Sequence, residues 1–543
     1  MDGQRSDEHA IEASADGSDQ SDQRTRATVT MPLAHRILEE TPPRRRWKSR
    51  RVYSALAVVL ALAVIGGGVG ALVVALRSPT RSSLGFHAAA CPFTPATGVA
   101  EGRDVRCGYV VVPQDHSQPK GPVIKLAVAV FASPNPSPKP DPVLILNGGP
   151  GTPLLEYSGP GLTPAIIGVT WSRNRDLILV DQRGVGYSRP SLDCVENTTM
   201  PQATNLQRVQ ACRDRLIKEG VNLNDYNTIQ NAEDIHDVIH ALGYRQVNLD
   251  GVSYATRLEL TVMRLYPEDV RTVLLDSTSP PQVDIDTGFP AATQRAFDTL
   301  FQGCAANSFC NHTYPHLQTV FAQLVTDLNQ HPVTIQGTDP ATGKPATATI
   351  TGDDVINGMR DSLYDTSLIP LLPKLIYQLA NHDYSSAASI SQQAQANQGS
   401  SSVGMALAVS CGESILTPQT IPAAVQPAEP ETRNYYVSSL QTDYAVCQIW
   451  NVPPVPAEQR QPVTSAIPTL IYAGEYDPTT PPAYGKLAAS TLSNSHFYQF
   501  PGVGHVVLGT SPCSVSIYQA YVEVPSEQPD ASCIQELMGP FFR

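Results

Sequence analysis

The segment LDGVSYA, residues 249–255, gives the clearest prediction of the fold. It lies between an apolar run typical of a β-strand and a helical pattern at residues 256–266. A chain that turns so sharply from strand to helix needs small neighbours around the central residue, and Gly251 and Ala255 meet that need. Ser253 then projects from the turn, where the amino end of the helix favours negative charge. Such a match is common by chance, so its strand and helix context carries the prediction that Ser253 is a nucleophile.

Further apolar, β-branched runs occur on both sides of this turn and predict strands. They lie at residues 123–131, 142–146, 176–180, 246–249, 271–275, 468–473 and 496–500. Helical patterns separate several of them. The clearest covers residues 231–242, with Ile235, Val238, Ile239 and Leu242 on one face and Asn231 expected as the cap. Strands that alternate with helices predict a mostly parallel sheet covered by helices on both faces.

The alternation stops in residues 279–462, which are rich in Ala, Gln and Pro and mostly helical in pattern. We expect this segment to be an insertion between two parts of one core, residues 96–278 and 463–543. Residues 77–95, with Ser, Pro and Thr near their start, are expected to form a linker.

The N-terminal part of the chain has a different composition. Residues 1–51 are polar and end in a dense basic run, which predicts a disordered cytoplasmic tail. Residues 52–76 contain no charged side chain and would span about 37 Å as a helix, enough to cross a bilayer core of about 30 Å. We therefore expect a single transmembrane helix with the rest of the chain outside the cell. The alternatives are a cleaved signal peptide or a lipoprotein joined at Cys91, and in both the apolar run lies too far from the modified site.

The ten cysteines all follow the apolar run, which favours an oxidising compartment and disulfide bonds. No Cys-x-x-Cys pair is present, so neither a metal nor another cofactor is expected. Sequence cannot decide the connectivity, and pairing between neighbours is the simplest hypothesis. It joins Cys91 with Cys107, Cys194 with Cys212, Cys304 with Cys310, Cys411 with Cys447, and Cys513 with Cys533.

Two loops that follow predicted strands complete the site. Residues 147–151, NGGPG, place backbone amides where a substrate oxygen would lie, and Gly149 together with the amide of Tyr254 is expected to form an oxyanion hole. The alternative is a plain Gly-Pro turn, whereas the absence of a following Lys-Ser/Thr excludes a P-loop. The second loop, DQRGVGYS at residues 181–188, is expected to brace the first through Asp181 and Arg183.

Five motifs occur in order: GGPG at 148–151, DQRGVGYS at 181–188, GVSYA at 251–255, YDPTTP at 476–481 and GVGHV at 502–506. As a set they resemble the prolyl iminopeptidase and tripeptidyl-aminopeptidase group of α/β hydrolases, from about residue 90 to the C-terminus. The resemblance implies an eight-stranded sheet, a helical lid before the strand of the catalytic acid, and exopeptidase activity on free N-termini. Asn147 stands where prolyl iminopeptidases usually have His. This departure favours the tripeptidyl branch. The C-terminal region that contains Cys513 and Cys533 also resembles the terminal domain of that branch.

The predicted acid and base follow the last two strands. Asp477 lies in a loop after the strand at 468–473 and occupies the family position, with Glu475 and Asp276 as competing carboxylates. His505 follows the final strand, so the order Ser253, Asp477, His505 matches that of α/β hydrolases. The other histidines lack such a setting and are expected to be surface or structurally satisfied residues.

The sequence therefore predicts a membrane-anchored, extracytoplasmic serine hydrolase that releases short N-terminal peptides through an acyl-enzyme. A carboxylesterase or lipase on the same scaffold is the alternative, since a fold does not determine its substrate. A non-catalytic binding domain at the cell surface is a further one. The net charge of −13 excludes a nucleic-acid partner, and the oligomeric state is not predicted.

An exopeptidase must recognise a charged amino group, for which a carboxylate is the simplest partner. Glu413 follows Cys411 closely, and the resemblance places an acidic residue at this point near the entrance to the site. We expect Glu413 to bind the substrate amine, with a solvated glutamate at a helix end as the alternative.

Overall fold

The computed structural model describes residues 85–338, 345–385 and 401–543, which belong to one compact unit, Arg77–Arg543. Within these ranges no helix combines the length and apolar composition needed to cross a membrane. The transmembrane helix predicted at residues 52–76 and the tail before it lie outside the described residues.

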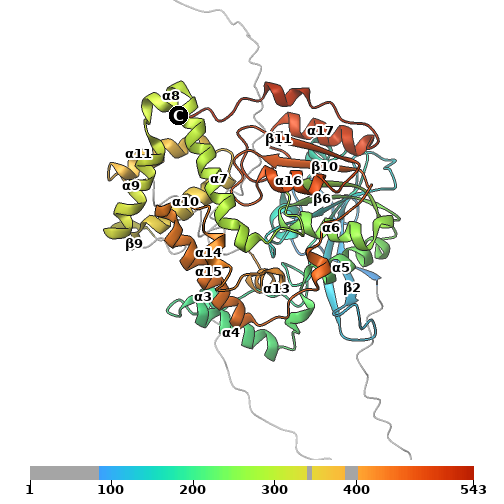
Figure 1. Ribbon diagram of the computed structural model, residues 1–543. Coiled ribbons are helices and arrows are strands. Elements are labelled where there is room, and N and C mark those ends of the chain that lie inside the picture. The colour runs from blue at the N-terminus through green and yellow to red at the C-terminus, as the bar shows by residue number, and fades with distance from the viewer. Residues whose placement is uncertain (1–84, 339–344, 386–400) are drawn as a thin grey trace, which may run out of the picture. The chain divides into compact units, whose positions relative to one another are not determined.

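A nine-stranded sheet forms the centre of the unit (Figure 1). Its order is β1-β2-β3-β5-β4-β6-β7-β10-β11, in which β1, β2 and β3 pair antiparallel and the strands from β5 to β11 pair parallel. The strands are β1 (Gly85–Ala89), β2 (Val105–Pro113), β3 (Val123–Phe131), β4 (Val143–Leu146), β5 (Leu177–Val180), β6 (Val247–Val252), β7 (Val270–Asp276), β10 (Thr469–Gly474) and β11 (Ser495–Phe500).

All seven strands predicted from apolar runs are present, together with β2, which no predicted run covers, and the sheet has nine strands rather than the eight that the resemblance implies. The additional strand is β1, which pairs antiparallel with β2 at the edge of the sheet. Residues 85–89 were expected to lie in a linker. Their backbone instead pairs with the sheet edge, a long-range contact that no local pattern encodes.

Helices cover the sheet, as expected for a parallel arrangement. They include α1 (Leu155–Ser158), α2 (Pro164–Thr170), α5 (Thr228–Ala241), α6 (Tyr254–Leu265), α16 (Pro482–Ala489) and α17 (Pro512–Glu523), whereas α3 (Glu196–Thr199) packs on α4 (Asn205–Lys218) and α4 packs on α15 (Pro430–Trp450). Helix α5 buries Ile235, Val238 and Ile239 in the main core, which confirms the predicted face. It begins earlier than predicted, because the Asn227 side chain, rather than that of Asn231, accepts from a first-turn amide and caps the helix.

The insertion between β7 and β10 is a mainly helical lid, as expected. Its elements are α7 (Ile285–Ala306), α8 (Ser308–Thr313), α9 (Leu317–Gln330), β8 (Val333–Thr338), β9 (Pro345–Ile350), α10 (Gly352–Tyr364), α11 (Leu372–Ala380), α13 (Val403–Glu413), α14 (Ile421–Ala424) and α15 (Pro430–Trp450). Figure 1 shows α7 to α11 gathered beside the sheet, where they share an apolar core of their own. The antiparallel β8–β9 hairpin was not predicted.

Five disulfides cross-link the unit, and they are the five neighbour pairs of the simplest hypothesis. The described residues include no free cysteine. Within the lid, the bond between Cys411 and Cys447 joins α13 to α15 and therefore holds the end of α13 in place.

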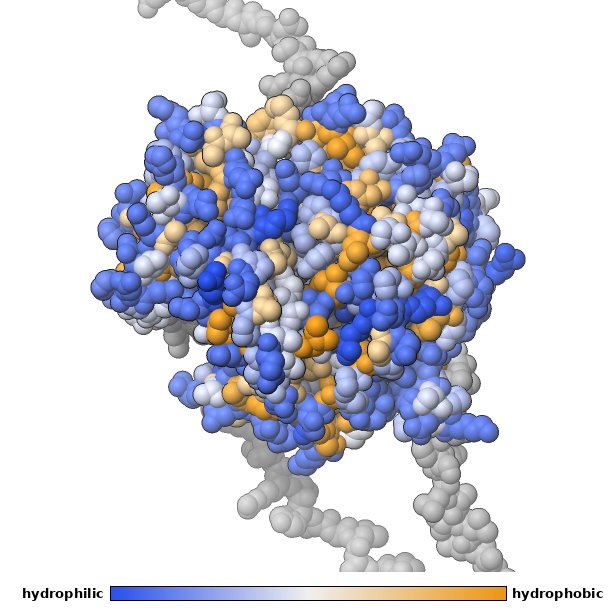
Figure 2. Space-filling view, in the orientation of Figure 1, coloured by the Kyte–Doolittle hydropathy of each residue, from blue (hydrophilic) through white to orange (hydrophobic). Residues whose placement is uncertain are grey.

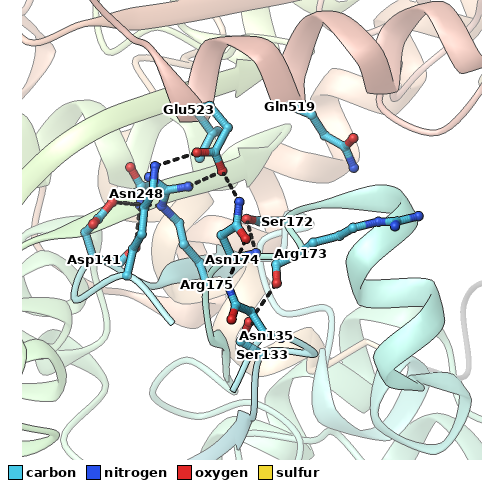
Figure 3. A network of polar contacts seen from close by, with 12 residues as sticks. Ser133, Asn135, Asp141, Ser172, Arg173, Asn174, Arg175, Asn248, Gln519 and Glu523 are labelled. Atoms are coloured by element: carbon cyan, nitrogen blue, oxygen red, sulfur yellow. Dashed lines mark hydrogen bonds and ion pairs between the residues drawn. The ribbon is translucent and has the colours of Figure 1, made fainter. Parts of the chain in front are cut away.

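A buried polar network connects α17 to the sheet (Figure 3). Arg175 lies at its centre and forms ion pairs with Asp141 at 2.8 Å and with Glu523 at 2.6 Å. The Asn248 amide donates to the Asp141 carboxylate at 3.1 Å, which includes β6 in the network. The outer surface seen in Figure 2 is mainly hydrophilic with scattered apolar patches, as the charged composition predicts.

Candidate active site

Ser253 occupies the tight turn between β6 and α6, as predicted. Its φ of 59° and ψ of −124° are strained for a residue with a side chain, a conformation that proteins keep at functional turns. The Ser253 amide donates to the Asp276 carbonyl at 3.0 Å, and Thr256 Oγ1 donates to the Ser253 carbonyl at 2.6 Å. These bonds tie the turn to β7 and to the first turn of α6, so the serine is held in position.

The NGGPG loop lies directly beside the serine. A Cβ added to Gly148 would come within 2.8 Å of the Ser253 Cβ, so only glycine permits this approach. Gly149 has a φ of +111°, which favours glycine for conformational reasons. Gly149 and Tyr254 line the same cavity as Ser253. The structure therefore brings together the nucleophile and both residues predicted for the oxyanion hole.

The DQRGVGYS loop braces this region. Gln182 Nε2 donates to the Asn147 carbonyl at 2.7 Å, and the Asp181 carboxylate accepts from the amides of Leu154, Leu155 and Tyr187. Arg183 is fully buried and binds the Asp234 carboxylate of α5 through two hydrogen bonds of 2.8 and 2.6 Å. The contacts of Asp181 agree with the predicted bracing role, whereas Arg183 ties its loop to α5 and the hydrogen bond to the NGGPG loop comes from Gln182.

Asp477 and His505 are in direct contact. The distance from His505 Nδ1 to Asp477 Oδ2 is 2.8 Å, and the carboxylate is completely buried. The other oxygen, Oδ1, accepts from the amides of Thr479 and Thr480 at 2.9 and 2.8 Å. Thr480 Oγ1 donates to Asp477 Oδ2 at 2.7 Å and lies 3.2 Å from His505 Nδ1. The carboxylate therefore has a single well-defined orientation toward the imidazole.

The electrostatics of this pair favour a charged imidazole. Burial by itself would raise the pKa of Asp477, but the His505 ring and the Thr480 hydrogen bonds hold that pKa below its ordinary value. Burial by itself would lower the pKa of His505. The Asp477 carboxylate has the larger effect and raises this pKa above its ordinary value of 6.5. An imidazole in this setting is a good proton acceptor.

The competing carboxylates have other tasks. Asp276 accepts from the amides of Val507 and Leu508 at 2.8 to 2.9 Å, which fixes the backbone just after His505. Burial raises the pKa of Asp276 to about 6. Glu475 accepts from the Gly502 amide at 2.8 Å. Both acids hold the histidine loop through its backbone, whereas Asp477 is bonded to the ring itself.

The lid also reaches His505, which sequence reasoning missed. The ring centroids of Tyr364 and His505 are 4.8 Å apart in an edge-to-face arrangement, and the His505 amide donates to the Tyr364 carbonyl at 3.2 Å. The Tyr364 hydroxyl is hydrogen-bonded to Thr479 Oγ1. No sequence pattern marks Tyr364. Thr480 carries a weak signal, since a hydroxyl just after an aspartate commonly bonds to it.

A cavity of about 250 Å³ opens beside Ser253 and is strongly acidic. Three carboxylates line it, those of Asp284 and Asp286 at the start of α7 and that of Glu413 at the end of α13. A single cationic side chain, Arg257 of α6, lies among them. The cavity is thus made jointly by the core and the lid.

Glu413 is only 6% exposed, so the alternative of a solvated glutamate is wrong. Its Oε2 lies 2.8 Å from Arg257 Nη1, and its Oε1 accepts a hydrogen bond from Thr228. Arg257 lies one helical turn after Ser253, so this ion pair connects the lid to the helix of the predicted nucleophile.

Comparison with known proteins agrees with this geometry. The α/β hydrolase fold family matches residues 141–512, more than half of the chain, and the chain belongs to that family. A tripeptidyl aminopeptidase of Streptomyces coelicolor is 29% identical over 198 residues, which cover 34% of this chain and 36% of that relative. Serine protease Hip1 of Mycobacterium tuberculosis is 25% identical over 445 residues, or 74% of this chain and 82% of the relative.

Among solved structures, a proline iminopeptidase of Mycobacterium smegmatis aligns with 16% identity and a TM-score of 0.30, over 73% of this chain and 91% of the other. The resemblance to this group of peptidases is confirmed by the named relatives. The match to the tripeptidyl aminopeptidase spans little more than a third of that relative's length. The family match and the contact between Asp477 and His505 together define an α/β hydrolase fold in which Ser253 occupies the nucleophile turn.

Thr480 provides a test of the geometry around Asp477. Replacement of Thr480 by Val removes the hydroxyl that donates to Asp477 Oδ2 but keeps a β-branched side chain. We expect kcat to fall by about tenfold or more with little change in KM, because a hydrogen bond to a charged group contributes roughly 1.5–3 kcal/mol. Steady-state kinetics on one ester substrate measures this, and Thr480→Ser, which keeps the hydroxyl, should retain most activity. Wild-type kcat in Thr480→Val would contradict the assignment.

Proposed function

We propose that the protein is an aminopeptidase that removes short peptides from free N-termini through an acyl-enzyme. The observation that carries the proposal is the acidic cavity beside Ser253, since an anionic pocket next to a nucleophile suits a substrate with a charged amino group. The named peptidase relatives support the same class of reaction.

In the proposed mechanism His505 accepts the Ser253 hydroxyl proton on Nε2 as Oγ attacks the scissile carbonyl carbon. The Asp477 carboxylate, bonded to Nδ1 at 2.8 Å, keeps the ring oriented and stabilises the imidazolium. The backbone amides of Gly149 and Tyr254 stabilise the negative oxygen of the tetrahedral intermediate. The imidazolium then gives its proton to the leaving amine, and the C-terminal part of the substrate departs.

A water molecule resolves the acyl-enzyme. His505 takes one proton from that water as its oxygen attacks the ester carbonyl, and the proton passes to Ser253 Oγ when the second intermediate collapses. The released product is the short N-terminal peptide with a free carboxylate. Because His505 must be neutral to begin each step, activity should be lost as the pH falls through its raised pKa.

The three carboxylates of the cavity differ in availability. Asp284 caps α7, because its Oδ1 accepts a hydrogen bond from the Thr287 amide. Its Oδ2 accepts from the Ile415 amide at 2.7 Å. Glu413 pairs with Arg257 at 2.8 Å. Asp286 forms no ion pair among the described residues, and its side chain bonds to Ser414. We therefore place the substrate ammonium against Asp286, with Glu413, the anchor expected from sequence, beside it.

The environment of Asp286 suits an incoming cation. Burial, with smaller contributions from the neighbouring Asp284 and Asp443, raises the pKa of Asp286 to about 7, against the opposing effects of Ser414 and Arg257. A bound ammonium would offset the cost of keeping this carboxylate charged. A neutral acyl ester supplies no such partner, so the cavity favours a peptide with a free amine over a simple ester.

The first experiment asks which reaction the enzyme performs. We expect the purified protein to hydrolyse free-amine peptide-coumarin substrates with higher kcat/KM than N-acetylated peptides or acyl esters. Ser253→Ala should abolish turnover and labelling by a fluorophosphonate probe, because the nucleophile is lost. A preference for acyl esters over every free-amine peptide would support the carboxylesterase alternative. Absence of turnover and of labelling in the wild type would support a non-catalytic binding domain.

A second experiment tests the amine anchor. Asp286→Asn should lower kcat/KM on free-amine peptides by about tenfold or more and leave esters nearly unchanged, since a charge-assisted bond of roughly 1.5–3 kcal/mol is lost. Asp327→Asn removes an exposed carboxylate of the lid helix α9 that is not among the cavity-lining residues, and it serves as the matched control. Glu413→Gln should affect amine substrates more than esters if Glu413 shares the role. Equal loss on both substrates would make Glu413 structural, and an unchanged Asp286→Asn enzyme would refute the anchor.

We also propose that residues 52–76 anchor the protein in the cell membrane with the hydrolase unit outside. The uncharged run, the basic residues before it and the ten cysteines after it support this arrangement. Protease added to intact cells should remove the hydrolase unit and leave a short membrane-bound stub. Complete protection of the unit, or its recovery in the soluble fraction without protease, would contradict the proposal.

A further inference from the structure

A group of metal-ligating side chains lies at the opposite edge of the sheet from Ser253. It consists of His236 and His240 on α5 and Asp269 at the end of a short helix, η3 (Pro267–Asp269). Asp269 immediately precedes β7, whereas Asp276, which holds the Ser253 amide, ends that strand. Seven residues of extended chain separate the two, about 23 Å. The group is therefore distinct from the proposed catalytic centre.

Helix geometry places the two histidines together. Residues four apart lie on the same face of a helix, one turn above the other, and the two ring centroids are 4.4 Å apart. The Asp269 carboxylate faces both rings. His236 Nδ1 lies 2.6 Å from Asp269 Oδ2, and His240 Nε2 lies 2.9 Å from Asp269 Oδ1. The three ligand atoms all lie within 4.8 Å of one another.

The Asp269 carboxylate is buried, and it lacks a partner with a permanent positive charge among the residues that the structure describes. The Asp269 side chain is only 1% exposed, and its ion-pair partners in the part of the chain that the structure describes are the two imidazoles alone. A buried carboxylate usually has an arginine, a lysine or a metal ion to compensate its charge. An imidazole carries a positive charge only when it is protonated, whereas a divalent ion would supply that charge permanently.

We propose that His236, His240 and Asp269 form a binding site for a divalent transition-metal ion of the zinc class. Each ring turns one nitrogen toward the carboxylate, so a metal bound by these nitrogens and by carboxylate oxygen would take the place of the two shared protons. Metal–ligand distances of about 2.0–2.2 Å would require each nitrogen to move somewhat away from the carboxylate oxygen that it now contacts at 2.6 or 2.9 Å. Imidazole nitrogen together with carboxylate oxygen is a donor set that zinc, copper, nickel and iron accept, whereas calcium and magnesium prefer oxygen alone.

Residues around the two histidines orient the rings and add negative charge. The Tyr266 ring stacks on His236 with centroids 4.0 Å apart and planes 16° apart, which restricts rotation of the ligand ring. The Tyr266 hydroxyl donates to Glu233 at 2.9 Å, and the charges of Glu233, Asp237 and Asp269 all act on this tyrosine. A cation would therefore bind in a negatively charged region, beside a histidine ring whose orientation is already restricted.

Solvent can reach the site from one side. The side chains of His236 and His240 are 30% and 50% exposed, which provides an entry path and room for water as a fourth ligand. A metal here would cross-link the second half of α5 to the turn that leads into β7. We assign it a stabilising role, since the nucleophile lies at the other end of the sheet.

Calorimetry on the full chain tests the proposal. After treatment with a chelator and its removal, titration with zinc sulfate should show one equivalent bound with micromolar or tighter affinity. The bound ion should also raise the melting temperature, because a ligand that binds only the folded state stabilises it. Calcium and magnesium should bind far more weakly. Cobalt(II) in place of zinc should produce visible absorption bands typical of nitrogen and oxygen ligands.

Variants separate this site from incidental metal binding. His236→Asn and His240→Asn can still donate to Asp269 but should each weaken zinc binding by about tenfold or more, since an imidazole ligand is lost. His312→Asn, which removes an exposed histidine of α8, is the matched control and should bind like the wild type. Fluorophosphonate labelling of Ser253 should persist in the variants and report an intact fold. No binding at millimolar zinc, equal binding by calcium, or unchanged affinity in both His variants would each overturn the proposal.

Discussion

The close packing of backbone around Ser253 is the constraint on which the rest of the structure depends. The strand must turn into α6 within one residue, so Ser253 adopts a positive φ of 59°. The loop after β4 must pass so near that a single Cβ on Gly148 would collide with the serine. Gly251, two residues before Ser253, is also confined, because an added Cβ would come within 2.5 Å of the Glu259 carboxylate. A nucleophile can be exposed at the sheet edge only because these neighbours carry no side chain.

Around this turn the molecule divides its tasks between core and lid. The core supplies the buried hydrogen bonds that orient Asp477 and hold the backbone after His505. The lid supplies Tyr364 against the histidine ring and Asp286 and Glu413 in the cavity. The proposed reaction chemistry therefore depends on the sheet, and the proposed preference for a charged amine depends on the lid. The ion pair of Glu413 with Arg257 joins the two, since Arg257 belongs to the same helix that begins at Ser253.

Much of this arrangement could be predicted from local sequence, and the failures have common physical causes. Strands were found because apolar β-branched runs are a local property, and β3 was predicted with its observed bounds. The start of α5 was misplaced because Asn227 and Asn231 are both acceptable caps, and tertiary packing selected the earlier one. Strand β1 and the β8–β9 hairpin were missed because their stability comes from partners, β1 from an edge far along the chain. The contact of Tyr364 with His505 joins residues far apart in sequence and leaves no pattern in either segment.

The tight turn at Ser253, the glycine-rich loop and the order of nucleophile, acid and base can all be predicted from the sequence. Each of these depends on the sizes or types of a few adjacent residues, which can be seen directly in the chain. Only the tertiary structure decided which carboxylate bonds to His505, because Asp276, Glu475 and Asp477 all end or follow strands at the same edge of the sheet. It also decided that Glu413 forms an ion pair with Arg257, whereas Asp286 forms none with any residue that the structure describes, and that Asp269 lies between two histidines. Charge compensation depends on distances between segments that fold together, and a linear sequence does not contain those distances.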